Sequence, residues 1–374
     1  LSPEVQALLG LSVSEIDPSS LISAILKPPV DLLWFGGIGT YVKAASQNNA
    51  EVGDPANDAL RVDAEDLRVK AVGEGANLGV TQAARLAFSA QGGRINNAFI
   101  DNSAGVDCSV NEVNIKIALN REMAEGRLSQ DDRDALLVRM TDNVSELVLE
   151  DNRLQALALS IAEKGGSAAV PSLVRIMETF EGAGRLDRKV EGLAANDELL
   201  RRAGEGRGLT RPELAVLLST AKLALQDAIE NSDLPDDPAL GGDLAAAFPE
   251  EMQRDFAQAI ADHQLRREII ATKIANRIIN RMGIVHPFEL VEEEGCALGD
   301  IAAAFVAVER LLEIPAIWEA LDEAKIDEGV RLSLFAQASS AMTSQMADLL
   351  RVTQSLSQPG PVVARLEPGV ARLT

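Results

Sequence analysis

Short apolar runs alternate with amphipathic stretches over the first 120 residues of the chain. Val30–Phe35 and Lys70–Val72 are apolar runs that end in glycine-rich turns, and Arg94–Ile100 ends in a polar loop. Between the last two, Thr81–Phe88 has helical periodicity with Thr81 as its N-cap. Short apolar strands that alternate with helices are typical of a parallel sheet, and such sheets bind ligands at the carboxyl ends of their strands. We therefore expect a small parallel sheet whose loops gather at one edge.

Helical periodicity replaces the strand pattern from about residue 121. The pattern predicts one helix over Leu128–Glu150 and another over Asp151–Lys164. Thr210–Glu213 predicts a further helix start, because it combines a Thr cap, a Pro in the first turn and a Glu three residues after the cap. Pro249–Met282 carries apolar residues at 3-4 spacing and is predicted to be one long helix.

The fold class predicted from these elements is α/β, with a partial Rossmann-like parallel sheet, followed by a mostly α-helical C-terminal domain. We divide the chain into residues 1–120, which contain the sheet, and residues 121–357, which form the helical domain. An alternative is that this helical domain consists of two subdomains. Residues 358–374 contain Pro and Gly and are predicted to be a loose tail.

Charge and composition narrow the classes of function. The 374 residues include 35 basic and 57 acidic ones, which gives a net charge of −22. Binding to nucleic acid or to an anionic membrane needs a basic face, so we expect neither partner. No apolar run reaches the roughly 18 residues that a membrane-spanning helix needs. The two cysteines, Cys108 and Cys296, are too far apart in the sequence for a zinc cluster, so we expect no metal. Sparse use of cysteine is typical of a reducing compartment, so we expect the protein to be cytoplasmic.

The loops that follow the three predicted strands are the candidate binding elements. Gly36–Gly39 lacks the third glycine of the dinucleotide fingerprint, so a tight turn is its alternative interpretation. The other two loops, Glu74–Asn77 and Asp101–Gly105, are rich in Gly and Asn and carry few charges. Backbone N–H groups and amides of this kind suit a ribose, a carboxamide or a carboxylate, but they do not specify a reaction.

Two of these loops resemble motifs of a known family. Glu74–Asn77, followed by Thr81, is similar to the E-G-A-N…T segment of glutamate dehydrogenases. Asn102–Glu112 resembles the family's N-A-G-G-V-x-x-S-x-x-E at identical spacing. Further stretches resemble the large bacterial NAD-specific branch, so that the resemblance covers almost the entire chain: Trp34–Ala44, Glu51–Asp54, Gly208–Leu217 and Leu265–Gly283.

The resemblance implies that residues 1–120 are the C-terminal part of an NAD-binding catalytic domain. The implied reaction is the oxidative deamination of L-glutamate to 2-oxoglutarate and ammonia with NAD as cofactor, in a full-length protein that is a homo-oligomer. By matching position, Asn102 would contact the nicotinamide ribose, and Ser109 would hydrogen-bond the distal carboxylate of glutamate. The residues that would line the cofactor groove are Gly36, Gly37, Gly75, Ala76 and Asn77.

The chain also departs from the family pattern. Ser103 and Ala104 replace the family's Ala and first Gly, and the Ala104 methyl puts the close backbone approach at that position in doubt. The family's catalytic Lys and Asp lie upstream of the dinucleotide domain, and nothing in this chain matches them. We therefore expect the catalytic residues to lie upstream of this chain, and we expect the chain alone to be inactive. The rival hypothesis is a helical module for oligomerisation or regulation of a larger metabolic enzyme, with the loop motifs as inherited packing.

The motif residues also have simpler structural interpretations. Glu74 has an equal claim to being an ordinary strand-end carboxylate, and Asn77 and Asn102 also suit the capping of turns. Ser109 also suits the N-cap of a helix that begins near Val110.

Three further residues have structural interpretations that we favour over functional ones. Glu112, three residues after Ser109, would complete a capping box. Cys108 is predicted to be a buried structural thiol rather than a nucleophile. His263 falls on the apolar stripe of its predicted helix and is expected to be a core histidine rather than a ligand or base.

Overall fold

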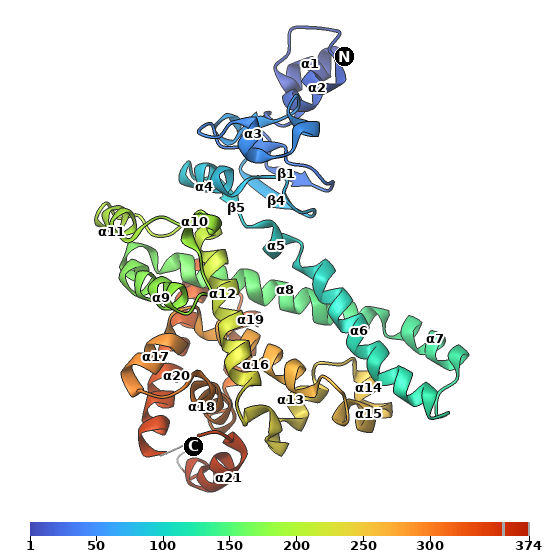
Figure 1. Cartoon of the computed structure of the whole chain (residues 1–374), viewed down its shortest axis with the longest axis vertical. Helices are drawn as coiled ribbons and strands as arrows, with labels where there is room; N and C mark the ends of the chain where they lie inside the picture. Colours follow the sequence, from blue (N-terminus) through green and yellow to red (C-terminus); the bar gives the residue numbers. More distant parts are fainter. Residues whose placement is uncertain (354–355, 373–374) are drawn as a thin grey trace. The chain divides into compact units, whose positions relative to one another are not determined.

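A computed structural model of the chain describes residues 1–353 and 356–372. These residues form two compact units, each assembled from separate stretches of sequence. Unit 1 contains Leu1–Ser103, Gly166–Val170 and Leu186–Val216, and unit 2 contains Ala104–Gly165, Pro171–Arg185 and Leu217–Thr374. The strands that the structure describes all belong to unit 1, whereas the described part of unit 2 is helical (Figure 1). The predicted fold class, an α/β part followed by a mostly helical part, is confirmed.

The main sheet of unit 1 consists, among the described residues, of three short parallel strands in the order β1-β4-β5. They are β1 (Leu32–Phe35), β4 (Ala71–Glu74) and β5 (Arg94–Ile95). Leu33 pairs with Val72, which pairs on its other side with Ile95. Helix α4 (Gln82–Ala90) connects β4 to β5, and Thr81 caps it by accepting the Ala84 N–H, as the sequence predicted.

An apolar cluster holds this short sheet together on one face. Phe35, Val72 and Ile95 from the strands pack with Phe88 of α4, and each of the four is at most 6% exposed. Burying one such side chain stabilises a fold by about 1.5–3 kcal/mol, which is more than a two-residue strand gains from its ladder hydrogen bonds. The cluster, rather than strand length, therefore fixes the sheet.

A second small sheet in unit 1 was not predicted. Its parallel strands are β2 (Val42–Lys43) and β3 (Val62–Asp63), and they enclose helix α3 (Asn49–Val52) and the 3-10 turn η1 (Pro55–Asn57). The side chain of Arg61 is fully buried and donates to the Thr40 carbonyl at 2.9 Å and to Asn49 Oδ1 at 2.8 Å. Strands of two residues carry no detectable alternation, so periodicity could not identify them.

The predicted strand over Arg94–Ile100 is only partly correct, because the strand ends at Ile95. Asn97 adopts the extended backbone of an N-cap and helix α5 (Ala98–Asp101) begins there. The other elements of unit 1 are α1 (Pro3–Leu9), α2 (Pro18–Ile25), η2 (Ala64–Asp66), η3 (Gly166–Ala169), α10 (Arg188–Glu191), α11 (Asn196–Gly204) and the first turns of α12 (Arg211–Glu230).

Unit 2 is a stack of helices. In chain order they are α6 (Ser103–Ala124), α7 (Gln130–Arg139), α8 (Thr141–Lys164), α9 (Val170–Gly182), the rest of α12, η4 (Leu234–Asp236), η5 (Pro238–Leu240), α13 (Gly241–Ala245), α14 (Glu250–Asp255), α15 (Ala257–Ala261), α16 (Arg266–Met282), α17 (His286–Glu294), α18 (Leu298–Leu311), α19 (Ile314–Glu323), α20 (Glu328–Val352) and α21 (Pro359–Val370). Over the described residues, none of these helices combines the length and apolarity needed to cross a membrane.

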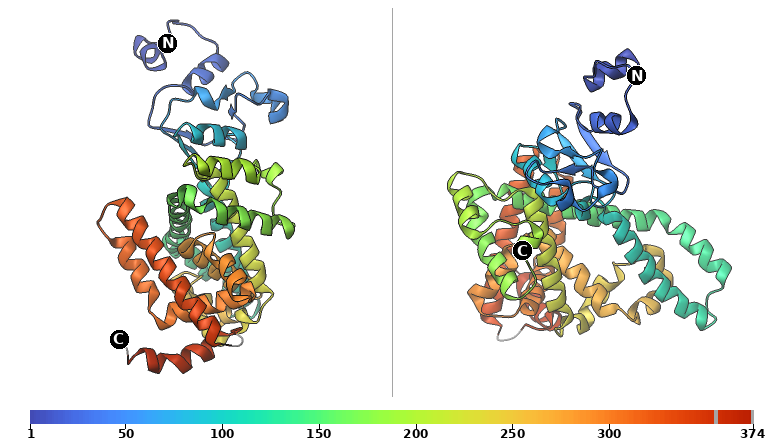
Figure 2. Two further views of the ribbon diagram at one scale, coloured as in Figure 1. Left: turned by 90° about the vertical axis from the view of Figure 1, so that its left-hand side faces the viewer. Right: turned by 45° about the horizontal axis from the view of Figure 1, so that its top comes forward.

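Helices α16 and α18 form the core of unit 2. Ile270, Ile274 and Ile278 of α16 are completely buried, and α18 is buried from Ile301 to Ala307. Helix α16 packs against α8 and α20, and α18 packs against α20 and α21. Helices α18 and α20 are visible side by side as neighbouring orange and red ribbons (Figure 2). A helix that is apolar on all sides, as α18 is from Ile301 to Val308, belongs at the centre of a helical stack.

The predicted single helix over Pro249–Met282 is wrong, because it is interrupted twice. Phe256 leaves helical geometry between α14 and α15, and residues 262–265 separate α15 from α16. His263 causes the second break: its Nδ1 accepts the Leu265 N–H at 3.0 Å, and its Nε2 lies 3.1 Å from the Asn114 carbonyl oxygen. His263 is 3% exposed and burial lowers its pKa, so the predicted core histidine is confirmed although its helix is not.

Two further boundaries differ from the predictions. The break between α7 and α8 falls at Met140, which is 1% exposed, instead of at Glu150. The predicted loose tail contains α21, which starts with Pro359, and the Gly360 N–H donates to Asp237 Oδ2 at 2.6 Å. Residues 373–374 of that tail lie outside the described residues. The division of the chain at residues 120 and 357 stays a prediction.

Candidate functional site

The loops after β1 and β4 meet at the carboxyl edge of the β1-β4-β5 sheet beside Asn102, whereas the predicted Asp101–Gly105 loop is helical apart from Asn102. The Ala76 N–H donates to the Phe35 carbonyl at 3.1 Å, which ties the loop after β4 to the end of β1. The Asn102 Nδ2 donates to Asn77 Oδ1, which ties the same loop to the end of α5. Asn77 is exposed and Asn102 is half-buried, so both amides remain accessible from solvent. Residues from two separate motifs are thus in direct contact.

The glycines of these loops differ in their surroundings. A Cβ added to Gly37 would have no described atom within 4 Å, and one added to Gly36 would meet only the edge of the Trp34 ring, at 3.9 Å. A Cβ on Gly75 would lie 2.6 Å from the Trp34 ring, and one on Gly73 would lie 2.5 Å from it. The Trp34 indole therefore lies flat on β4, and Gly75 is required by this packing. Gly36 and Gly37 leave their backbone open.

Glu74 is buried completely at the end of β4 and has a structural part to play. Its carboxylate pairs with Arg85 of α4 at 2.7 Å and 2.9 Å, and it accepts the Val80 N–H at 3.1 Å. A buried carboxylate needs a charged or hydrogen-bonding partner, because the burial of an unpaired ion destabilises the fold by on the order of several kcal/mol. These bonds close the loop from Gly75 to Val80 on both sides, which favours the interpretation of Glu74 as an anchor.

Asp101 makes hydrogen bonds beside the candidate site that the sequence did not reveal. Its Oδ2 accepts the Glu74 N–H at 2.9 Å, and its Oδ1 accepts the Asn96 side chain at 2.7 Å. Burial raises the pKa of Asp101, while the hydrogen bonds from Asn96 and Glu74 and the nearby Arg211 and Arg85 act in the opposite direction. Asp101 joins the start of one motif loop to the residue before Asn102. Its position next to Asn102 in the sequence gave no indication of this contact.

Ser109 lies on helix α6 and belongs to unit 2. The helix begins at Ser103, so Ser109 is in its second turn, and the alternative interpretation of Ser109 as an N-cap is wrong. Its hydroxyl donates to the Gly105 carbonyl at 3.1 Å, and the residue is exposed. Glu112 pairs with Lys116 instead of completing a capping box. Ser103 and Ala104, which differ from the family motif, lie in the first turn of the helix.

The cysteine prediction was wrong in one respect. Cys108 is exposed on α6, not buried, because the helix places it on the same open side as Gly105 and Ser109. Cys108 and Cys296 are both free. Among the described residues, no His, Cys, Asp and Glu side chains are grouped as they would be to hold a metal ion.

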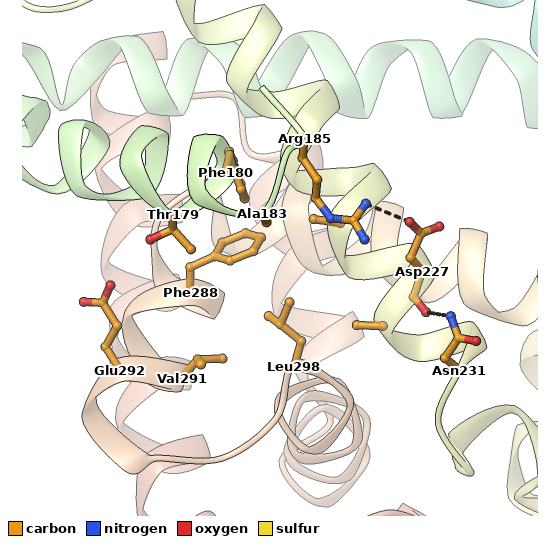
Figure 3. A pocket seen from close by; sticks show the side chains of 12 residues that line it. Thr179, Phe180, Ala183, Arg185, Asp227, Asn231, Phe288, Val291, Glu292 and Leu298 are labelled. Carbon is orange, nitrogen blue, oxygen red and sulfur yellow. Dashed lines mark hydrogen bonds and ion pairs between the residues drawn. The ribbon is translucent and has the colours of Figure 1, made fainter. Parts of the chain in front are cut away.

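Unit 2 contains an apolar pocket of about 340 Å³ between α9, α12, α17 and α18 (Figure 3). Phe180 and Phe288 meet edge to face in its wall, with 5.0 Å between ring centroids. Arg185 and Asp227 form an ion pair at 2.7 Å in its lining, which also contains Thr179, Asn231 and Glu292. A dinucleotide carries a diphosphate and two riboses and needs many donors, so this pocket does not suit one.

A smaller pocket of about 180 Å³ lies between α6, α8 and α16 and contains charged groups. Lys273 pairs with Asp151 at 2.7 Å. Burial, helped by the negative charge of Asp151, raises the pKa of Asp107 to about 6. Burial lowers the pKa of the nearby Lys222 to about 8, and its ammonium donates to Gln155 Oε1 at 3.0 Å. Asp107 Oδ2 is buried and has no hydrogen-bond partner among the described residues.

Comparison with known proteins identifies the chain's relatives. Residues 1–162 match the family model "Bacterial NAD-glutamate dehydrogenase, catalytic domain", and residues 206–374 match "Glutamate dehydrogenase, C-terminal". The NAD-specific glutamate dehydrogenase of Pseudomonas aeruginosa is 46% identical over 315 residues, which are 84% of this chain and 19% of the relative. Those of Halomonas elongata and Mycobacterium tuberculosis are each 40% identical, over 94% and 87% of this chain and 21% and 20% of the relatives.

The chain therefore spans about a fifth of the length of these relatives, and the two family models leave only residues 163–205 unmatched. The loops that meet at the sheet edge lie within the first model, and most of the helical stack of unit 2 lies within the second. The resemblance stated from the motifs is confirmed, and the chain belongs to the family of large bacterial NAD-specific glutamate dehydrogenases.

Proposed function

We propose that this chain supplies part of the cofactor site and part of the substrate site of an NAD-specific glutamate dehydrogenase. The observation that carries the proposal is the direct contact between Asn77 and Asn102, which come from two separate motifs and meet at the carboxyl edge of a parallel sheet. Ligands bind at this edge in open α/β sheets. The relatives are NAD-specific glutamate dehydrogenases, and the reaction that we propose for the full-length enzyme is the conversion of L-glutamate, NAD⁺ and water to 2-oxoglutarate, ammonium, NADH and a proton.

The residues at this edge fit the nicotinamide half of NAD. The open backbone at Gly36 and Gly37 allows close approach by a ring or a ribose. The amides of Asn77 and Asn102 each hold a donor and an acceptor, as a ribose diol requires. NAD, when bound, supplies the acceptor for the hydride that leaves the α-carbon of glutamate. Gly75 and Ala76 line the same edge, where the hydrogen bond from Ala76 to Phe35 fixes the loop.

Ser109 is proposed to bind the distal carboxylate of glutamate. Its hydroxyl is exposed in the second turn of α6, one turn from the helix N-terminus, and an exposed hydroxyl can donate a hydrogen bond to a carboxylate. The present bond to Gly105 uses the hydroxyl proton, and rotation of the side chain would turn that proton to a ligand. The residues that exchange protons with the substrate are proposed to lie outside this chain.

The experiment is a kinetic comparison of Asn102→Ala and Ser109→Ala in the full-length enzyme. We expect Asn102→Ala to raise KM for NAD about tenfold, as befits the loss of one or two hydrogen bonds, with KM for glutamate little changed. Ser109→Ala should show the reverse pattern, so that each variant serves as the control for the other. Unchanged KM values for both variants, with normal folding, would refute the assignment of the site.

We also propose that the helical region contributes contacts between subunits of a homo-oligomer in the cytoplasm. Val138 on α7 and Leu149 on α8 are 75% and 65% exposed, and apolar side chains of this size are commonly covered in an assembly. The two free cysteines suit a reducing compartment. In this form the rival hypothesis, a helical oligomerisation module, is compatible with the dehydrogenase.

A further inference from the structure

A series of hydrogen bonds links helix α12 to both motif loops of the candidate site. The Arg211 Nε donates to Asn96 Oδ1, and the Asn96 Nδ2 donates to Asp101 Oδ1 at 2.7 Å. The second oxygen, Asp101 Oδ2, accepts the Glu74 N–H at 2.9 Å. All of these residues belong to unit 1. The series ends at the residue before Gly75 on one side and at the residue before Asn102 on the other.

The direction of each hydrogen bond in this series is fixed by its two ends. An arginine can only donate and a carboxylate can only accept, so Asn96 must present its oxygen to Arg211 and its nitrogen to Asp101. A flipped Asn96 would place donor against donor and acceptor against acceptor. Consecutive hydrogen bonds between charged ends strengthen one another, because each polarises the next.

The start of α12 is itself held in place, so Arg211 is presented from a rigid support. The Thr210 N–H and hydroxyl both donate to Glu213 Oε2, at 2.7 Å and 2.8 Å. Arg202 of α11 donates to the other oxygen of the buried Glu213 at 2.9 Å. This anchored turn lies in the segment matched by the C-terminal model, whereas both loops lie in the segment matched by the catalytic-domain model.

We propose that Arg211 is a positioning residue for dinucleotide binding, which acts through Asn96 and Asp101 to hold the Glu74–Asn77 loop against Asn102. The proposal rests on the proposed function of these loops. Without the Arg211 contact, Asn96 can turn over and Asp101 loses its fixed donor. The Glu74 N–H and the Asn77–Asn102 contact then lose their common support, so cofactor affinity falls while substrate affinity does not.

The first variant is Arg211→Met in the full-length enzyme, with Arg207→Met as the matched control. Arg207 lies in the same segment, is exposed and pairs with Glu205. We expect Arg211→Met to raise KM for NAD about tenfold, with KM for glutamate within about twofold, because a lost hydrogen bond to a positioned charged group has roughly this effect. Arg207→Met should match the wild type in both constants.

The decisive test is an exchange of the two middle residues. Asn96→Asp alone sets two carboxylates against each other, and Asp101→Asn alone sets an amide nitrogen against a donor. Asn96→Asp combined with Asp101→Asn restores every bond with the roles reversed. Arg211 then donates to the new carboxylate at position 96, and the new amide at position 101 donates to that carboxylate and accepts the Glu74 N–H. We expect each single change to weaken NAD binding and the pair to recover it.

Amide hydrogen exchange of the peptides that contain residues 74–77 and 102 separates the possible failures. Faster exchange at these loops in Arg211→Met, together with a raised KM for NAD, supports the proposal. Faster exchange with unchanged KM for NAD means that the loops are positioned by Arg211 but do not contact the cofactor, which overturns the proposed function. Unchanged exchange, or a double variant no better than the single ones, overturns the role of Arg211 even if Asn102→Ala behaves as expected.

Discussion

At the scale of single residues, the buried carboxylate of Glu309 gives the molecule a specific response to pH. Glu309 lies on α18 with its side chain 5% exposed, and it pairs with Arg277 at 3.0 Å. Burial outweighs the attraction of Arg277 and raises the pKa of Glu309 from 4.5 to about 7. The folded protein thus binds more protons here than the unfolded chain does between these two values. The stability contributed by this residue is complete below about pH 4.5 and is lost as pH rises through 7.

Replacing Glu309 by Gln should remove this loss, because glutamine resembles the protonated acid in shape and cannot ionise. Relative to the wild type, Glu309→Gln should gain about 2–3 kcal/mol of unfolding free energy between pH 5 and pH 8. Urea unfolding across this range measures the difference, with the exposed Glu319→Gln on α19 as the control. A constant difference between Glu309→Gln and the wild type at all pH values would contradict the prediction.

The predictions for single residues were most accurate where the hydrogen bond joins residues that are close in the sequence. Thr81 is predicted as a cap and is one, because capping depends on a residue three positions away. The sequence allows two interpretations of Glu74, because its ion pair with Arg85 depends on how α4 packs against β4. Asn96 and Arg211 are 115 positions apart, so nothing local in the sequence predicted their contact.

At the scale of elements, helix starts were more predictable than helix ends and breaks. Caps and prolines mark where α4 and α12 begin, whereas the break between α15 and α16 depends on bonds made by His263. The apolar 3-4 pattern continues through this break, because the buried side chains keep their spacing in the sequence although the helical backbone hydrogen bonds are interrupted. Periodicity thus identified the buried face and missed the interruption.

Removal of the His263 ring should destabilise this junction. His263→Ala loses the bond from the Leu265 N–H and the contact with Asn114, and it leaves a cavity beside Phe248, so we expect a loss of about 2–4 kcal/mol. His263→Asn should lose less, because an asparagine oxygen can accept the N–H two residues on. Chemical denaturation measures both, with the exposed Gln264→Ala as control. Equal losses for Ala and Asn would show that the N–H bond is unimportant.

At the scale of the whole molecule, the sequence predicted the order of the two fold classes but not how stretches combine. Unit 1 includes residues 166–170 and 186–216 in addition to the first 103 residues. Hydrophobic patterning describes one element at a time, and it does not show which distant segment covers which surface. The loops after β1 and β4 were predictable as neighbours because parallel strands end at one edge of a sheet, whereas Asn102 follows helix α5, and the hydrogen bond from α12 was not predictable.

The chain by itself should show no turnover. Hydride transfer requires cofactor and substrate at near-attack distance beside acid-base groups, and this chain matches no such group of its family. We expect purified chain with L-glutamate and NAD to form NADH no faster than its Ser109→Ala variant. Glutamate-dependent NADH formation above that control would show that the catalytic residues lie within these 374 positions.

Helix α12 begins in one unit and ends in the other, and the C-terminal family model begins at residue 206, just before this helix. The two segments that the family models match therefore cannot be exchanged between relatives independently of each other. A chimaera that took residues 206–374 from a distant relative would receive a foreign residue at position 211 opposite the resident Asn96. Such a recombinant could keep every residue of the cofactor loops and still bind its cofactor poorly, so the unit of exchange between relatives has to include both ends of this contact.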